Sequence, residues 1–261
     1  MAPIAVMTMA EKAKGETQGI LLKMRRISKE KGSVYLFKTT IRSLRRRLNL
    51  FFWFCYYRMS PWRKFTFQQR KYKYFIHKYN QTWRSERTVE VPIIWDILRH
   101  CKGEVLEVGN VLSHYFEVRH EIVDKHEKAK GVVNQDVADL RLPKKYDLIV
   151  SISTLEHVGW DENPNYSESA REPDKVIIAF EKLKASLKTG GEIVVTLPIG
   201  YNPYLDVAIG NGKIDFDKMF CLRRISKNRW IETNWENVRK LKFGSPFPFA
   251  NGLVIGTIER G

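Results

Sequence analysis

Short apolar runs separated by polar turns dominate the chain from about residue 100 onward. The length of these runs and the turns that bound them predict buried strands. We place the strands near 104–109, 120–124, 131–135, 146–152, 191–197, 219–225 and 251–259. Helices are predicted near 110–118 and 172–188, the second between Pro173 and the glycines Gly190 and Gly191. Strands that alternate with helices indicate a doubly wound, mostly parallel α/β sheet of seven strands.

The first 100 residues follow a different pattern, rich in basic and aromatic residues. Residues 1–33 lack clear periodicity and predict a mobile arm or a loosely held helix. Ile41, Leu44 and Leu48 share one helical stripe, with arginines around it. An aromatic run follows over 48–57, and further helices are predicted over 65–79 and over 91–98, where Pro92 lies in the first turn. The sequence thus predicts a basic, mainly helical N-terminal extension over 1–79 and a second domain over 80–261.

The charge of the chain is concentrated in its first part. The net charge is +16, and residues 1–100 hold 22 lysines and arginines against 6 aspartates and glutamates. Residues 101–261 hold 23 of each kind and are neutral in sum. This asymmetry predicts that the N-terminal part attaches to an anionic surface.

Three partners suit this basic and aromatic region. On a membrane, Phe51, Trp53 and Tyr56 would lie at the depth of the headgroups, and residues 35–79 would contact anionic lipid. On RNA, the same aromatic side chains would stack on bases while the cations neutralise phosphates. The continuous apolar block favours the membrane over nucleic acid. Packing of the block against the second domain or another subunit is a third alternative and stays open.

Size and cysteine content place the chain in a broad class. A chain of 261 residues can bury one full core and still carry an appendage. Cys55, Cys101 and Cys221 are widely spaced and predict neither a disulfide framework nor a zinc site, and no other metal site is expected. No apolar run reaches the roughly 20 residues that span a bilayer, and the first residues do not predict a secretion signal. We therefore expect a cytoplasmic protein, with attachment to the inner face of the membrane as an extension of that expectation.

Acidic and small polar residues follow the ends of the predicted strands. Glu107-Val108-Gly109-Asn110 closes the first strand, Asp124-Lys125 closes the second, and Asp136-Val137 follows the third. Ser153 ends the fourth strand, with Glu156-His157 just beyond it. Because the carboxyl ends of parallel strands meet at one edge of a sheet, these residues predict a pocket of the nucleotide-binding kind. A carboxylate there can accept two hydrogen bonds from ribose hydroxyls.

This ordered set resembles the class I S-adenosylmethionine-dependent methyltransferases over roughly residues 85–260. The resemblance implies a Rossmann-like sheet, S-adenosyl-L-methionine as the cofactor and methyl transfer as the reaction. It implies that Asp124 binds the ribose, that Asp136 and the amide of Val137 bind the adenine, and that Gly109 lies under the methionine part. The candidate cofactor-binding residues are Arg84, Glu107, Gly109, Asn110, Asp124, Lys125, Asp136, Val137 and Ser153.

The turn after the first strand distinguishes two cofactor classes. The resembling family often has two or three glycines there, whereas here Gly109 stands alone. A dinucleotide site needs Gly-x-Gly-x-x-Gly to bring a pyrophosphate onto a helix N-terminus. Val111, Leu112 and His114 occupy that place, which disfavours a dehydrogenase. Arg84 suits the methionine carboxylate as a bidentate partner, although a continuation of the basic surface explains it equally well.

The acceptor side of the reaction has its own candidates. Glu156 and His157 are the candidate catalytic residues, with His157 as the general base because imidazole titrates near neutrality. The alternative is that both only cap the strand and hold the loop. Trp160, Tyr201 and Asn202 are the candidate substrate-binding residues. The predicted function is O-methylation of a small molecule, a sugar or a membrane-associated glycan. An RNA methyltransferase that uses the basic extension, or a non-catalytic binding protein on this fold, are the alternatives.

Overall fold

The computed structural model describes residues 22–23, 26, 28–60, 62–161 and 171–261. The chain divides into two compact units, residues 1–56 and 57–261, which are described separately below. The division between the units falls before Tyr57, and not at the boundary after residue 79 that the sequence indicated. The arm predicted over 1–33 lies largely outside the described residues.

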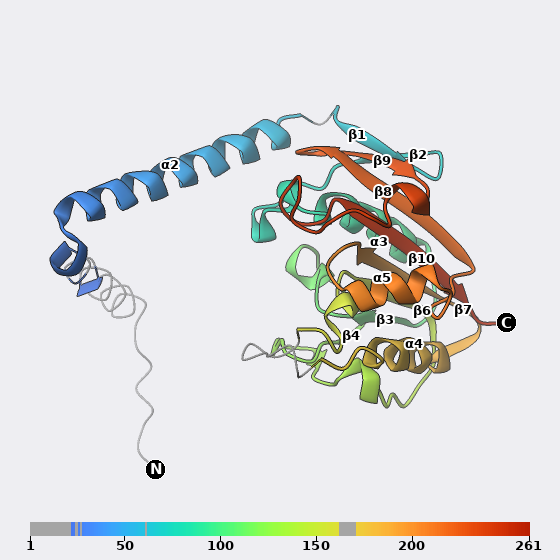
Figure 1. Cartoon of the computed structure of the whole chain (residues 1–261). Helices are drawn as coiled ribbons and strands as arrows, with labels where there is room; N and C mark the ends of the chain where they lie inside the picture. The colour runs from blue at the N-terminus through green and yellow to red at the C-terminus, as the bar shows by residue number, and fades with distance from the viewer. Residues whose placement is uncertain (1–21, 24–25, 27, 61, 162–170) are drawn as a thin grey trace, which may run out of the picture. The chain divides into compact units, whose positions relative to one another are not determined.

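A mixed sheet of eight strands forms the centre of the second unit (Figure 1). Its order is β5-β4-β3-β6-β7-β10-β8-β9. The first five strands in this order are mutually parallel, and the last three pair antiparallel. The strand bounds are β3 Val105–Val108, β4 Glu121–Val123, β5 Val132–Val133, β6 Tyr146–Ile152, β7 Leu187–Pro198, β8 Lys218–Ser226, β9 Arg229–Thr233 and β10 Gly252–Glu259. The doubly wound, mostly parallel α/β fold is confirmed, and β9 is an eighth strand beyond the seven that were predicted.

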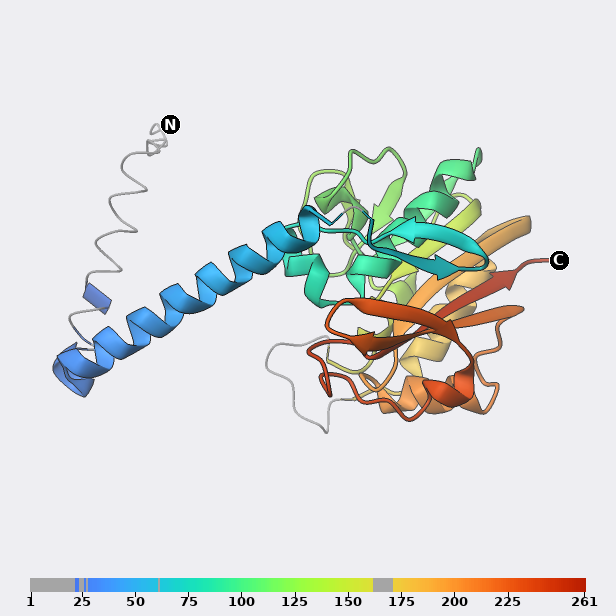
Figure 2. The same cartoon turned by 90° about the horizontal axis from the view of Figure 1, so that it is seen from above.

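Helices and a hairpin cover the two faces of this sheet (Figures 1 and 2). One core contains buried side chains of α4 (Lys175–Ala185) and α5 (Pro203–Gly210). The other contains those of α3 (Arg87–His100) and of β1 (Lys64–Phe67), which pairs with β2 (Arg70–Lys73). Each face of the central strands is therefore buried, which explains why the strands read as nearly continuous apolar runs.

The stretch 65–79 is a hairpin and not the predicted helix. Phe65 and Phe67 alternate with exposed residues along β1, so the period is two, as in a strand with one buried face. Gln68 and Gln69 both have positive φ angles, as a two-residue hairpin turn requires. Basic residues occupy exposed positions of this stretch. They hid the alternation of buried and exposed positions when the sequence was read alone.

Helix α3 begins earlier than predicted. It starts at Arg87, so Pro92 lies inside the helix and not in its first turn. Proline has no N–H to donate to the carbonyl of Thr88, four residues before it. That carbonyl instead accepts from the N–H of Phe75, at 2.9 Å. The proline therefore leaves the Thr88 carbonyl available to Phe75, and this hydrogen bond attaches the segment after β2 to the helix.

Two other predicted helices differ in the structure. Between 110 and 118 there is only a short 3-10 turn, η2 (Leu112–His114), because the Glu107 carboxylate accepts the N–H groups of Val111 and Leu112. The helix predicted over 172–188 ends at Ala185, and β7 begins two residues later, so its boundary glycines lie within the strand. Helix α5 was not predicted at all.

The described part of the first unit contains one long helix. Helix α2 runs from Ser33 to Arg58, and its last two residues belong to the second unit. The predicted arginine-flanked stripe and the aromatic run are therefore parts of one element. Among the residues that the structure describes, no helix combines the length and apolar character needed to cross a bilayer.

Candidate functional site

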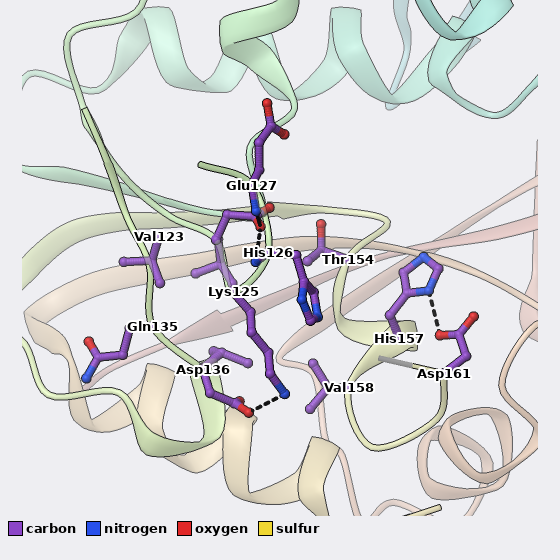
Figure 3. Close-up of a pocket in the computed structure, with 14 residues that line it drawn as sticks. Val123, Lys125, His126, Glu127, Gln135, Asp136, Thr154, His157, Val158 and Asp161 are labelled. Carbon is purple, nitrogen blue, oxygen red and sulfur yellow. Dashed lines mark hydrogen bonds and ion pairs between the residues drawn. The ribbon is translucent and has the colours of Figure 1, made fainter. Parts of the chain in front are cut away.

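A cavity of about 460 Å³ opens at the carboxyl ends of β3, β4, β5 and β6 (Figure 3). The order of the strands reverses between β3 and β6, and this is the place where doubly wound sheets bind ligands. The lining residues are Val108, Gly109, Val123, Asp124, Lys125, His126, Glu127, Gln135, Asp136, Val137, Thr154, His157, Val158 and Asp161. Five of the nine predicted cofactor-binding residues are in this set.

Gly109 shapes the turn at the end of β3. Its φ is +86°, and its N–H donates to the carbonyl of Val123 at 2.8 Å. A Cβ at this position would overlap the side chain of Thr154 on the neighbouring loop. Both the conformation and the space thus require glycine here.

Asp124 holds the loop after β4 through both oxygens. One oxygen accepts from the N–H of Asn110 at 3.0 Å, and the other accepts from the N–H groups of His126 and Glu127, each at 2.8 Å. Burial acts to raise the pKa of Asp124, but these three N–H groups outweigh it and lower the pKa. Asp124 is thus ionised at neutral pH and lines the cavity with about one of its four acceptor positions unused.

Asp136 is the centre of an ion triad at the lower side of the cavity in Figure 3. Lys125 and Lys175 each lie 2.8 Å from one carboxylate oxygen, and the other oxygen accepts from the N–H of Ala138 at 3.0 Å. Burial opposes ionisation, yet the two lysines lower the pKa of Asp136 to about 2. An adenine amino group at the predicted position would therefore compete with Lys125 and Lys175 for the Asp136 carboxylate. Val137, the other predicted adenine contact, lines the same side of the cavity.

The cavity is electrostatically suited to a cation. Four carboxylates line it, those of Asp124, Glu127, Asp136 and Asp161. Lys125 is the one lysine or arginine among the lining residues, and it is paired with Asp136. No α-helix begins at the turn after β3, since that segment is a 3-10 turn. A pyrophosphate would meet carboxylates and lack a helix N-terminus, which strengthens the case against a dinucleotide.

His157, Asp161 and Tyr201 form a hydrogen-bonded group at one side of the cavity. Nδ1 of His157 lies 2.8 Å from Asp161 Oδ1 and 3.2 Å from the Tyr201 hydroxyl, which also donates to Asp161 Oδ2. Burial and the bond to Asp161 raise the pKa of Tyr201, so it stays a donor. Because the carboxylate accepts from Nδ1–H, the proton of a neutral imidazole lies on that nitrogen and Nε2 carries a lone pair. The imidazole is 45% exposed and lines the cavity, as a general base must.

Four of the predicted cofactor-binding residues lie outside the cavity lining. Glu107 is fully buried, bonded to the loop N–H groups and to His120 at 2.6 Å. The side chain of Asn110 accepts from Ser113. Ser153 donates to Glu90 of α3, and Arg84 donates to Gln81 at 2.6 Å. These residues support the loops around the cavity and do not face it.

Glu156 lies behind the loop rather than in the cavity. It is 2% exposed, and burial raises its pKa well above the ordinary value. One of its carboxylate oxygens has no hydrogen-bond partner among the described residues. Burial thus favours the neutral form of this acid, which does not fit the role of an exposed catalytic base.

The predicted substrate-binding residues have mixed positions. Asn202 is buried, where it caps α5 by accepting from Tyr204 and Leu205 and donates to the Glu156 carbonyl at 2.9 Å. Trp160 packs against Arg171 and Tyr204. Asn202 is thus committed to positioning the loop that follows β6, and only Tyr201 of the three joins the group around His157.

Several lining residues were not predicted from the sequence. Thr154, Val158 and Asp161 belong to the loop after β6, and His126, Glu127 and Gln135 to the loops after β4 and β5. The spacing of His157 and Asp161 is the one usable signal, since residues four apart in a helical turn face one another. The remaining contacts depend on how neighbouring loops fold back over the strand ends.

Comparison with known proteins finds distant similarity to solved structures. No protein-family model matches the chain, and no curated protein matches it. The N-methyltransferase NodS from Bradyrhizobium japonicum, in complex with S-adenosyl-L-homocysteine, is similar at 9% identity, with a TM-score of 0.41 over 67% of this chain and 87% of that one. A methyltransferase from Thermotoga maritima, described as a possible histamine N-methyltransferase, is similar at 11% identity, with a TM-score of 0.37 over 67% of this chain and 91% of that one. A putative rRNA methylase from Clostridium thermocellum is similar at 12% identity, with a TM-score of 0.38 over 65% of this chain and 97% of that one. All three are described as methylating enzymes.

Proposed function

We propose that this protein is an S-adenosylmethionine-dependent methyltransferase. The observation that carries the proposal is the meeting of four strand ends in one acid-lined cavity. Gly109, Asp124, the adjacent Asp136 and Val137, and His157 were selected from four separate segments of the sequence, and all of them line it. Such convergence at the switch point of the sheet is expected of a cofactor site and not of four unrelated turns.

The lining residues fit this cofactor in size and charge. The volume of about 460 Å³ lies within the range of small-molecule sites. The sulfonium and ammonium groups are cationic, and four carboxylates line the cavity. Asp124 would accept from the ribose, and Val123, Val137 and Val158 would contact apolar parts of the ligand. Bound there, S-adenosyl-L-methionine supplies a methyl group on a positively charged sulfur.

His157 is the proposed general base for a hydroxyl acceptor. Asp161 orients the imidazole, and Nε2, which lies 3.8 Å from Glu156 Oε1, accepts the proton that the hydroxyl loses on methylation. Tyr201 holds Asp161 from the other side, so the base is positioned by two neighbours. The proposed reaction is therefore O-methylation, and the acceptor class is a small molecule or a sugar that approaches the exposed edge of His157.

Calorimetric titration with S-adenosyl-L-methionine and with its demethylated product tests the cofactor. We expect saturable binding of both, weakened about tenfold or more in Asp124→Asn, because a lost hydrogen bond to a charged group has a large effect. The exposed Asp215→Asn serves as the matched control and should bind as the parent does. Absence of binding at millimolar ligand by the folded parent protein would remove the proposal.

The role of His157 is tested by transfer of a labelled methyl group to a panel of hydroxylated acceptors. His157→Ala should bind the cofactor with parental affinity and lose about 10²- to 10⁴-fold in turnover. Asp161→Ala should lose less, because the imidazole remains but is no longer oriented. Parental turnover in His157→Ala would exclude the histidine as the base.

A further inference from the structure

The apolar side chains of α2 follow a regular seven-residue pattern along one side of the helix. Successive members are three and four residues apart, and their exposed fractions lie between 47% and 68%. They are Val34, Phe37, Ile41, Leu44, Leu48 and Phe51. On a helical projection they occupy a stripe roughly 100° wide, the width that normally faces a protein core. The exposed Phe52 and Tyr56 widen this stripe in the last turns. We call this set the apolar stripe.

The charges of α2 are all of one sign. Residues 33–58 contain six basic residues and no aspartate or glutamate. Arg45 and Arg47 flank the apolar stripe on its two sides, and Arg42 and Arg46 lie away from it. All four of these arginines are exposed. A surface that covers the stripe would meet flanking cations, so charge complementarity calls for an anionic occupant.

The helix is suited to lie along a membrane and not to cross it. Its 26 residues extend roughly 39 Å, longer than the hydrocarbon core. Three consecutive arginines, Arg45 to Arg47, stand at its middle, where a spanning helix would bring them to the centre of the bilayer at high cost. Lying in the plane of the interface, the same arginines reach the headgroups while the apolar stripe enters the acyl boundary.

Pairing of two copies of α2 is less favourable. A homodimer through the apolar stripe would bring two helices of six positive charges each together without a carboxylate on either. An anionic lipid leaflet neutralises the arginines and accepts the aromatic side chains at headgroup depth.

A basic cavity of about 250 Å³ lies in the second unit at the end of α2. Arg58, Arg63 and Lys73 line it, together with Tyr57 and Tyr74, and no carboxylate is among the lining residues. Arg63 is held in place by the ring of Tyr57, 4.9 Å away, and by the carbonyl of Asn228 at 2.5 Å. The region that follows the helix thus offers a second set of cations suited to a phosphate group.

We propose that α2 is a membrane-surface anchor that binds a leaflet rich in anionic phospholipid. The apolar stripe inserts at the level of the acyl boundary, and the flanking Arg45 and Arg47 contact the phosphates. The anchor is separate from the methyltransferase cavity and acts whether or not the proposed reaction takes place.

Co-sedimentation of the full chain with vesicles tests the anchor. Vesicles of phosphatidylcholine alone are compared with vesicles that also contain phosphatidylglycerol, and we expect strong binding only to the second. The triple variant Arg45→Gln, Arg46→Gln, Arg47→Gln should bind the anionic vesicles about a hundredfold more weakly. The variant Leu44→Ser, Leu48→Ser, Phe51→Ser should lose binding to the anionic vesicles, because the apolar stripe can no longer insert.

The matched control removes three exposed cations elsewhere, as Lys182→Gln, Lys213→Gln, Lys240→Gln. It has the same net charge as the arginine variant and should bind vesicles nearly as the parent does. Equal loss in both charge variants would overturn the anchor, since total charge would then be the cause. Binding that ignores lipid charge would overturn it, as would a dimer in lipid-free solution that the serine variant dissociates. Tighter binding of the parent to RNA than to anionic vesicles would also overturn it.

Discussion

The ion triad of Asp136 allows a quantitative prediction. The Asp136 carboxylate pairs with Lys125, in the loop after β4, and with Lys175, in the first turn of α4. The Nζ atom of each lysine lies 2.8 Å from Asp136 Oδ2. Its side chain is 15% exposed, so solvent screens the pairs only in part. Burial alone would raise the pKa of this carboxyl, but the lysines and the N–H of Ala138 lower it from 3.8 to about 2.

The shift corresponds to about 2 kcal/mol of folding free energy at neutral pH. Because the pKa is lower in the folded protein than in the unfolded chain, this contribution is complete above the unfolded value of 3.8. It is lost as the pH falls toward about 2, where the folded carboxyl takes up its proton. Asp136→Asn should therefore lower the free energy of unfolding by about 2 kcal/mol at pH 7, and the difference from the parent should shrink toward zero in acid.

Urea unfolding followed by tryptophan fluorescence, repeated at decreasing pH, measures this difference. Glu181→Gln removes a carboxylate from an exposed pair with Lys184 and is the matched control, which should differ little from the parent at any pH. A deficit of Asp136→Asn that stays constant or grows as the pH falls would refute the reasoning. The lysines would then not be what stabilises the charged carboxylate.

Three further substitutions test other parts of the second unit. Burial raises the pKa of Asp206 to about 6, so parental stability should fall by about 3 kcal/mol as the pH rises from about 4 through 6, and Asp206→Asn should lack this slope in the same unfolding assay. Gly109→Ala places a methyl group against Thr154 at positive φ and should cost roughly 2 to 4 kcal/mol, with loss of ligand binding; a parental melting temperature would contradict this. Glu156→Gln replaces a buried acid whose pKa is raised, so its stability relative to the parent should increase with pH above the ordinary glutamate range. A relative stability that decreases with pH would show that Glu156 is buried as a carboxylate.

The strands of the parallel half could be predicted because their residues are buried on both faces. Val105 to Val108 and Tyr146 to Ile152 are apolar runs with few exposed positions, a pattern that does not depend on the partner strand. Strand β9 and the hairpin β1–β2 were missed because most of their positions are exposed and few apolar residues are buried in them. These strands form because they pair with adjacent strands of their sheets, and their own amino-acid composition does not predict that pairing.

The candidate site was predictable in position but less so in side-chain direction. Asp124 and Asp136 meet because parallel strands end at one edge, which follows from the order of the elements alone. Glu107 was placed in the cavity by the same reasoning, yet its carboxylate turns to the loop N–H groups and His120. Which donors a buried carboxylate finds depends on how the loops beyond the strand fold, and the sequence pattern does not contain that information.

Buried hydrogen bonds to the turn at Ser153 influence the position of a cavity residue, although the bonded residues do not line the cavity. Ser153 has a φ of +38°, a conformation that costs a non-glycine residue of order 1–3 kcal/mol. Its hydroxyl donates to Glu90 of α3, and its N–H donates to the backbone carbonyl of Thr196 in β7 at 3.0 Å. Arg87 neutralises Glu90 at 2.6 Å and also donates to the Ser153 carbonyl at 3.3 Å. Because these bonds come from two different elements, they fix the angle at which the chain leaves β6. That angle places His157 at the cavity, so the strain at Ser153 is maintained by α3 and β7 and positions the proposed base.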